Sequence, residues 1–170
     1  RGGERIGVIG ETGRARPGRA RRDGCVQALA DGPGAARSLE AAEIPRRSVV
    51  VIASDFLDPP ETWMKRLEAA RAAGASGALV HLVDPAEDDF PFTGRIRFKG
   101  PGGGEPVLFG RADEARDAYR ARWRAHGEAV AALARSAGLT LVTHRTDRPA
   151  AGALLSLHQA ISGAVPGVRP

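Results

Sequence analysis

The sequence is poor in cysteine, lysine and aromatic residues. One cysteine, Cys25, excludes an internal disulfide framework and fits a reducing, cytoplasmic compartment, where we expect an ordinary buried thiol. Aromatic residues form 5% of the chain and hydrophobic residues 42%, which is typical of a globular protein with an aliphatic core. No apolar run approaches the roughly 20 residues needed to cross a bilayer. The sequence opens on Arg1, so we expect earlier residues to be missing, and we expect no signal peptide in the residues given.

Basic residues are plentiful, but nearly all are arginine. The net charge is +5 and the pI about 10.5, while Lys65 and Lys99 are the only lysines. Together with abundant Ala, Gly and Pro, this bias is typical of a GC-rich genome. One cluster without interleaved aromatics for base stacking contains Arg14, Arg16, Arg19, Arg21 and Arg22. We therefore expect no nucleic-acid partner; phosphate or nucleic-acid binding through this cluster is a third hypothesis, and it would weaken steeply with salt.

Strand and helix patterns alternate along the chain. Apolar runs predict strands at residues 5–9, 48–53, 78–83 and 139–143, and helical spacing predicts helices at 21–30, 59–73, 113–137 and 150–162. The runs at 48–53 and 78–83 do not alternate, which indicates strands covered on both faces. Residues 95–109 predict a β-hairpin outside the main sheet. The order predicts one α/β domain over residues 1–170, with a mostly parallel sheet, helices on both faces and an inserted β-hairpin.

Three of the helices have a predicted apolar face. These faces comprise Trp63, Leu67 and Ala70; Tyr119, Trp123, His126, Val130, Leu133 and Ala137; and Leu154, Leu157 and Ile161. Gly74 and Gly138 are the expected stops of the first two helices. His81 lies within a strand pattern and His126 on a helix stripe, so we interpret both as satisfied core histidines.

Carboxylates follow two of the predicted strands. Asp58 and Asp84 each precede a proline, with a glutamate three residues after the aspartate. An aspartate N-cap followed by proline is a typical helix start, and the glutamate completes a capping box. Asp147 repeats the device more loosely. We interpret these residues as caps, although ligands of open α/β sheets also bind at the carboxyl ends of the strands.

Asp55 comes too early to be the cap of a helix that starts near Pro59. Two roles are possible for Asp55: it binds a metal ion, or it forms hydrogen bonds within the loop. An alternative function is a metal-dependent hydrolase that uses Asp55, Asp58 and Asp84 together with His144. A nucleophilic set of Ser54, Asp55 and His144 is a further possibility, but nothing in the spacing specifies it. The loop at 10–18 lacks the Lys-Ser/Thr pair of a P-loop, so we interpret it as a flexible arginine-bearing loop.

Several segments together resemble one known family. They are VVVIASDFLDP, LVHLVDPAEDDFPFTGRIRF, the helix with Tyr119 and His126, and THRTDRP. The chain resembles the bacterial domain-of-unknown-function family numbered 58, a von Willebrand factor A-like branch, from about residue 4 to 160. The resemblance implies a von Willebrand factor A-like fold. Family members often accompany MoxR-type AAA+ ATPases, so it also implies a non-enzymatic, cytoplasmic scaffold or adaptor that binds such an ATPase.

The same resemblance assigns Asp55 to a cation site. Metal-binding A domains hold a divalent cation with Asp-x-Ser-x-Ser after their first strand, a loop threonine, and an aspartate that matches Asp55. This sequence lacks Asp-x-Ser-x-Ser, and one carboxylate is far short of the six or so oxygens of Mg²⁺. We therefore expect no cofactor in this chain, with Mg²⁺ possible only if an upstream Asp-x-Ser-x-Ser exists. The matching strand is also missing beside residues 48–53, so we expect low stability for this chain alone.

Overall fold

The computed structural model describes residues 5–9, 19–30, 43–98, 105 and 107–164. The elements in chain order are α1 (Arg19–Ala30), β1 (Val49–Ser54), α2 (Pro60–Ala72), β2 (Ser76–Val83), α3 (Pro85–Asp89), β3 (Ile96–Phe98), β4 (Val107–Phe109), α4 (Ala112–Ala137), β5 (Thr140–Arg145) and α5 (Ala150–Ala164). They fall into two compact units. The first contains α1 and nearly all of α2, and the second contains the remaining elements.

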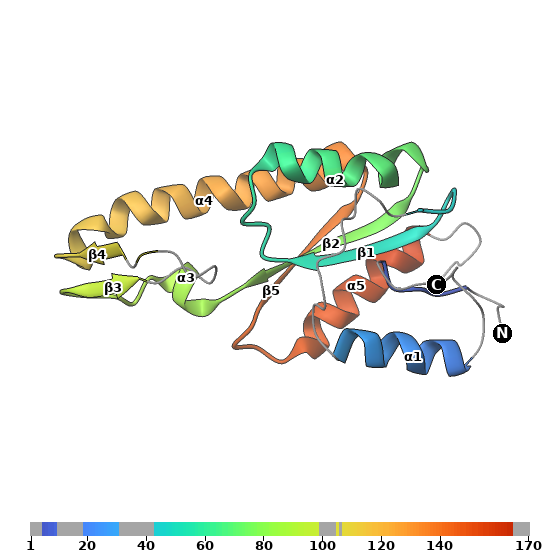
Figure 1. Cartoon of the computed structure of the whole chain (residues 1–170), viewed down its shortest axis with the longest axis horizontal. Helices are drawn as coiled ribbons and strands as arrows, with labels where there is room; N and C mark the ends of the chain where they lie inside the picture. Colours follow the sequence, from blue (N-terminus) through green and yellow to red (C-terminus); the bar gives the residue numbers. More distant parts are fainter. Residues whose placement is uncertain (1–4, 10–18, 31–42, 99–104, 106, 165–170) are drawn as a thin grey trace. The chain divides into compact units, whose positions relative to one another are not determined.

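The second unit is built on a parallel sheet. Its three strands lie in the order β1-β2-β5, and helices flank them, so the predicted α/β class with a parallel sheet is confirmed. The helix α5 packs against β2 and β5, and α4 contacts the same two strands (Figure 1). The central strand β2 is buried along almost its whole length, as the unbroken apolar run at 78–83 predicts.

Strand register decides which residues share a face of this sheet. Ser54 lies opposite His81, which in turn lies opposite Thr143. The next pair is Leu82 with His144, on the other face, because side chains alternate along a strand. The face of Leu82 forms an apolar core with residues of α5, whereas His81 is near side chains of α4. The helices α4 and α5 therefore cover opposite faces of the sheet.

The strand β1 is not covered on both faces, which corrects the prediction for residues 48–53. Its burial alternates: Val50 is buried, but Val49 and Val51 are 41% and 45% exposed. The reason is position, since β1 is an edge strand and α5 packs on β2 and β5. An apolar run on an edge strand looks the same in sequence as one on a central strand.

The N-terminal predictions have a mixed outcome. The predicted strand at residues 5–9 is wrong: only Ile6 makes an isolated β-bridge there. Gly7 interrupts the short apolar run, and glycine weakens a strand because it has no side chain to pack. The predicted helix at 21–30 is confirmed as α1. The loop at 10–18, with Arg14 and Arg16, lies outside the described residues, and nothing is described of the side chains at 19–22.

The strands β3 and β4 pair antiparallel as a separate two-stranded sheet. Ile96 lies opposite Phe109, and Phe98 opposite Val107. The residues between them, at 99–104 and 106, lie outside the described part of the chain. The pair is attached to the start of α4, because the Ala112 amide donates to the Gly94 carbonyl at 2.8 Å and the Gly94 amide donates to Asp113 Oδ1 at 3.0 Å (Figure 1).

The predicted helix faces agree with the structure except in α5. Trp63, Leu67 and Ala70 are the buried residues of α2, and Val130 and Leu133 are buried in α4, as expected. In α5, Leu157 packs on the sheet together with Ala153 and Ala160, whereas Leu154 is 61% exposed. The packed face therefore lies one residue away from the predicted one. Gly74 and Gly138 have the positive φ of helix stops. No helix in the described ranges combines the length and apolarity needed to span a membrane.

Candidate binding edge at the carboxyl ends of the strands

Asp55 lies directly beyond β1 in a turn that holds its side chain in place. The Leu57 amide and the Ser54 hydroxyl both donate to Asp55 Oδ1, each at 3.3 Å, and the Phe56 amide donates to Ser54 Oγ at 3.1 Å. Phe56 has a left-handed backbone, with φ of 56°, and its side chain is buried. A bulky residue in this conformation stores strain, and burial of the ring offsets it. The turn therefore presents Asp55 as an exposed, oriented carboxylate.

Two histidines contact this turn. His126, from α4, places Nε2 3.3 Å from the Asp55 carbonyl oxygen, so the tautomer protonated at Nε2 donates a hydrogen bond to it. His81, from β2, has its ring 5.5 Å from His126 and 6.0 Å from the ring of Phe56. The imidazoles connect the Asp55 turn to the central strand and to the long helix, and the spacing of residues along the sequence does not reveal this.

His81 is buried as predicted, but it is not fully satisfied. Its side chain is 4% exposed, and Nε2 has no hydrogen-bond partner. Burial lowers the pKa of His81, and the neighbouring charge of His126 lowers it further; hydrogen bonding to the Asp55 backbone opposes both effects. Burial therefore favours the neutral form of His81, and its unpaired Nε2 corrects the interpretation of a satisfied core residue.

Glu87, on α3, completes the titratable groups of this edge. Burial raises the pKa of Glu87, and the nearby charges of Asp84 and Asp55 also raise it. A backbone hydrogen bond at Asp84 and the charge of His126 act in the opposite direction. The edge thus brings three carboxyl groups and an imidazole close enough to influence one another.

The predicted capping role of Asp84 is confirmed. Its Oδ1 accepts from the Ala86 amide at 2.7 Å, with Pro85 in the first turn of α3. The equivalent role of Asp58 stays a prediction, since α2 begins at Pro60. Asp147 does not cap α5; its carboxylate accepts from the Arg145 guanidinium at 3.0 Å. An arginine two residues away offers Asp147 a charged partner, which is stronger than a neutral amide.

The proposed nucleophilic and hydrolytic sets do not gather around one point. Ser54 shares a face with His81, while His144 shares the opposite face with Leu82. Asp84 is engaged by its own helix. Among the residues that the structure describes, no three His, Cys, Asp or Glu side chains could hold a metal ion together. Asp55 on its own is a poor fit for Mg²⁺, which needs about six oxygens.

An arginine at the end of β5 binds the segment that follows β2. Arg145 donates to Asp88 at 2.6 Å, to Asp89 at 2.9 Å and to Asp147 at 3.0 Å, while its side chain is 21% exposed. These hydrogen bonds hold the pKa of Asp89 and of Asp147 below their ordinary values and raise that of Arg145. One guanidinium thereby bridges three carboxylates and offsets part of the negative charge of the stretch after β2.

The helix α4 binds the same segment, residues 84–94, along its length. Trp123 Nε1 donates to Asp88 at 3.2 Å, Arg116 to the Phe92 carbonyl at 3.0 Å, and Arg120 to the Asp89 carbonyl at 3.3 Å. This is the Asp-Pro-Ala-Glu-Asp-Asp-Phe-Pro-Phe-Thr-Gly stretch. Its residues therefore connect α3, α4 and β5, and none of these contacts could be inferred from residue spacing.

Most of the chain's few aromatic side chains gather on one face of α4. Six of the eight Phe, Trp and Tyr residues have ring contacts within one series with His81 and His126: Phe56, Phe90, Phe92, Phe98, Tyr119 and Trp123. The closest pair is Phe90 with Tyr119, at 4.4 Å between ring centroids. The predicted stripe of α4 indicated Tyr119, Trp123 and His126 of this cluster, and the contribution of Phe90 was not predicted.

Comparison with known proteins assigns this chain to a protein family. Residues 1–129 match the family described as "Protein of unknown function DUF58". The chain belongs to this family. Uncharacterized proteins of Mycobacterium bovis and Mycobacterium tuberculosis are each 30% identical over 163 residues, covering 86% of this chain and 51% of their own length. An uncharacterized protein of Mycobacterium avium is 33% identical over 103 residues, covering 61% of this chain and 60% of itself.

The chain spans about half the length of the first of these relatives. No solved structure matches it. The part matched to DUF58 includes the Asp55 turn and the whole 84–94 segment, whereas β5 and α5 lie beyond it. Arg145, which pairs with Asp88 and Asp89 of that segment, therefore comes from outside the matched region.

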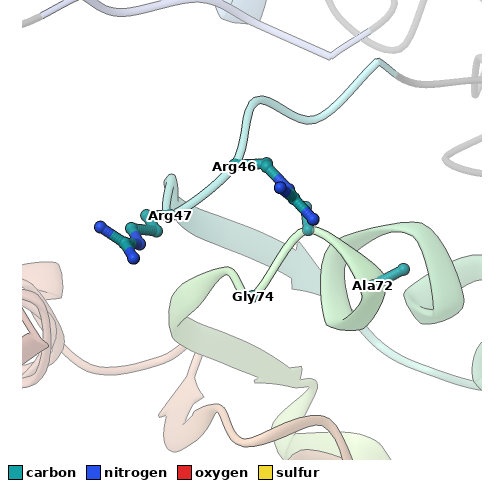
Figure 2. Close-up of a pocket in the computed structure, with 5 residues that line it drawn as sticks. Arg46, Arg47, Ala72 and Gly74 are labelled. Atoms are coloured by element: carbon teal, nitrogen blue, oxygen red, sulfur yellow. The ribbon is translucent and has the colours of Figure 1, made fainter.

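The first unit has an open pocket of about 620 Å³ lined by Arg46, Arg47, Ala72, Ala73 and Gly74. Two arginines on one pocket raise the question of an anion site. Figure 2 shows their side chains pointing apart, so they do not converge on one ligand. The pocket also lies at the C-terminal end of α2, where the helix dipole disfavours anions. We assign no site there.

Proposed function

We propose that this chain is a von Willebrand factor A-like interaction domain that serves as an adaptor for a MoxR-type AAA+ ATPase. Its binding edge is the carboxyl end of the parallel sheet around Asp55, and the β3–β4 pair is an insertion that makes a second contact. The proposal rests on the resemblance of the strand exits to A domains. Membership of DUF58 supports it, although that family's function is itself unknown.

One observation carries the choice of edge: Asp55 is an exposed carboxylate held by hydrogen bonds within its own turn. Its Oδ1 accepts from the Leu57 amide and the Ser54 hydroxyl, and buried Phe56 anchors the turn. Preorganised polar groups lose less conformational entropy on binding than mobile ones. An oriented carboxylate at this point suits a cationic group of a partner. It would equally supply one ligand of a cation completed by other groups.

The test is a quantitative pull-down with a purified MoxR-type ATPase. Asp55→Asn removes the charge and retains an acceptor for the Leu57 amide, so the turn should persist while binding weakens about tenfold, as for a central interface residue. The matched control is Glu128→Ala, which removes an exposed carboxylate from α4. Binding by Asp55→Asn that equals wild type, with unchanged circular dichroism, would exclude Asp55 from the interface.

A further inference from the structure

A pocket of about 330 Å³ lies where α3, β3 and α4 meet. It is lined by Phe90, Phe98, Ala115, Ala118, Tyr119 and Arg122. Its volume is near the lower end of the range that bound ligands occupy in proteins. Five of the six lining residues carry apolar or aromatic side chains, and one carries a positive charge. This pocket belongs neither to the Asp55 edge nor to the arginine-lined pocket of the first unit.

The walls of the pocket are held in place before any partner arrives. Phe90 is buried and has a left-handed backbone, with φ of 43°, at the end of α3. Its ring contacts Tyr119 at 4.4 Å and stacks on Phe98 at 6.3 Å. The hydrogen bond from Arg116 to the neighbouring Phe92 carbonyl fixes the same loop on α4. Rigid aromatic walls of this kind reduce the entropy cost of binding.

The mouth of the pocket carries unbalanced positive charge. Arg122 is exposed, and the described residues supply no ion pair for it, whereas Arg111 in the same helix is paired with Glu114 at 2.6 Å. Arg95, just before β3, and Arg97, within it, are exposed, and the half-buried residues Ile96 and Phe98 alternate with them. They add to the positive potential around the pocket without lining it.

We propose that this pocket binds one large apolar side chain from an acidic segment of a partner protein, with a carboxylate of that segment at Arg122. The proposal deepens the proposed function and rests on it, because it names the chemistry of the second contact beside the β3–β4 pair. The combination of an aromatic-walled pocket with an arginine is typical of interface hot spots. The excess of arginine selects acidic partners over basic ones.

The experiment measures binding of short fluorescein-labelled peptides to the full chain by fluorescence anisotropy. One peptide carries a single Trp among Asp and Glu; a second has Ala in place of the Trp, and a third has Lys in place of the acids. Ala118→Leu fills the pocket, and Arg122→Glu reverses its charge. Their controls are Ala121→Leu and Arg124→Glu, which make the same changes at exposed positions of α4 that do not line the pocket.

The Trp-containing acidic peptide should bind best, and both pocket variants should weaken it about tenfold while the controls do not. Circular dichroism shows whether each variant is folded. Equal binding of the Trp and Ala peptides, no binding of any peptide, or pocket variants that match their controls would overturn the proposal. Self-association that Ala118→Leu abolishes would also overturn it, by showing a second copy as the occupant.

The outcome is separable from that of the proposed function. Peptide binding at the pocket without capture of the ATPase would count against the adaptor role and leave the pocket intact. Capture of the ATPase that is insensitive to Arg122→Glu, with no peptide binding, would remove the pocket and leave the Asp55 edge.

Discussion

His81 is the one polar side chain that is buried among the residues with described burial. It lies in the central strand, with Phe56, Trp123 and His126 as ring neighbours. Burial disfavours the charged imidazole here, and Nε2 has no hydrogen-bond partner among the described residues.

Acidification should destabilise the chain through His81. Its pKa is lower in the folded than in the unfolded protein, so the unfolded state binds the proton first as the pH falls below about 6.5. Stability is therefore fully present above that pH and decreases as the pH falls, with a slope of at most about 1.4 kcal/mol per pH unit from one histidine. Urea unfolding at several pH values measures this slope.

His81→Phe should reduce that slope, since phenylalanine fills the aromatic site without titrating. The matched control is His158→Gln, at an exposed position of α5, which should leave the slope unchanged. An unaltered pH dependence in His81→Phe would assign the effect to other groups of the edge.

The 84–94 segment acts as a connector at the level of elements. It leaves β2, forms the short helix α3, and returns to the first turn of α4 through Gly94. Its acidic residues contact β5 through Arg145, and its backbone contacts α4 through Arg116 and Arg120. These interactions position Phe90 and thus the pocket. The segment therefore has a structural role that the predicted capping box of Asp84 covers only in part.

Replacing Arg145 should loosen this connector. Arg145→Gln leaves Asp88, Asp89 and Asp147 without the guanidinium that bridges them, so the thermal midpoint should fall by a few degrees, on the order of 3 °C. Arg124→Gln, which removes an exposed arginine of α4, is the control and should leave the midpoint unchanged. Differential scanning calorimetry measures both.

Salt distinguishes the mechanism of that loss. Screening weakens the repulsion among the exposed carboxylates, so the difference between Arg145→Gln and the wild type should shrink in high salt. A difference that does not change with salt would point to lost packing of the arginine stem.

At the scale of the whole molecule, the sheet of the second unit has three strands among the described residues. One face of its edge strand β1 exposes Val49 and Val51. On α5, Leu154 and Leu155 are also exposed, at 61% and 60%. Apolar side chains in water contribute nothing to the core, and an unpaired strand edge is open to association.

Residues 1–170 alone should therefore have low stability. We expect a thermal midpoint below about 50 °C, under that of most mesophilic domains. Circular dichroism at two protein concentrations measures the midpoint and detects association through the edge of β1. A cooperative transition above that temperature, independent of concentration, would contradict the prediction.

The spacing of apolar residues predicted the buried faces well in α2 and β2. The stripe of Trp63, Leu67 and Ala70 and the unbroken run of β2 identified their buried faces because a helix or a central strand repeats at its own spacing. The same reasoning failed for β1, whose burial depends on what lies beside it. It also misplaced Leu154, since the packed face of α5 depends on how the helix is rotated against the sheet.

The sequence by itself determined the α/β class, the buried strand β2, the cap at Asp84 and the position of Asp55 just after a strand. Each of these depends on residues a few positions apart. Only the tertiary structure decided that His126 rather than His144 meets the Asp55 turn, and that Arg145 binds Asp88 and Asp89. Those contacts join residues 56 to 71 positions apart. Strand register and helix packing create these contacts. Neither can be read from the spacing of apolar residues along the sequence.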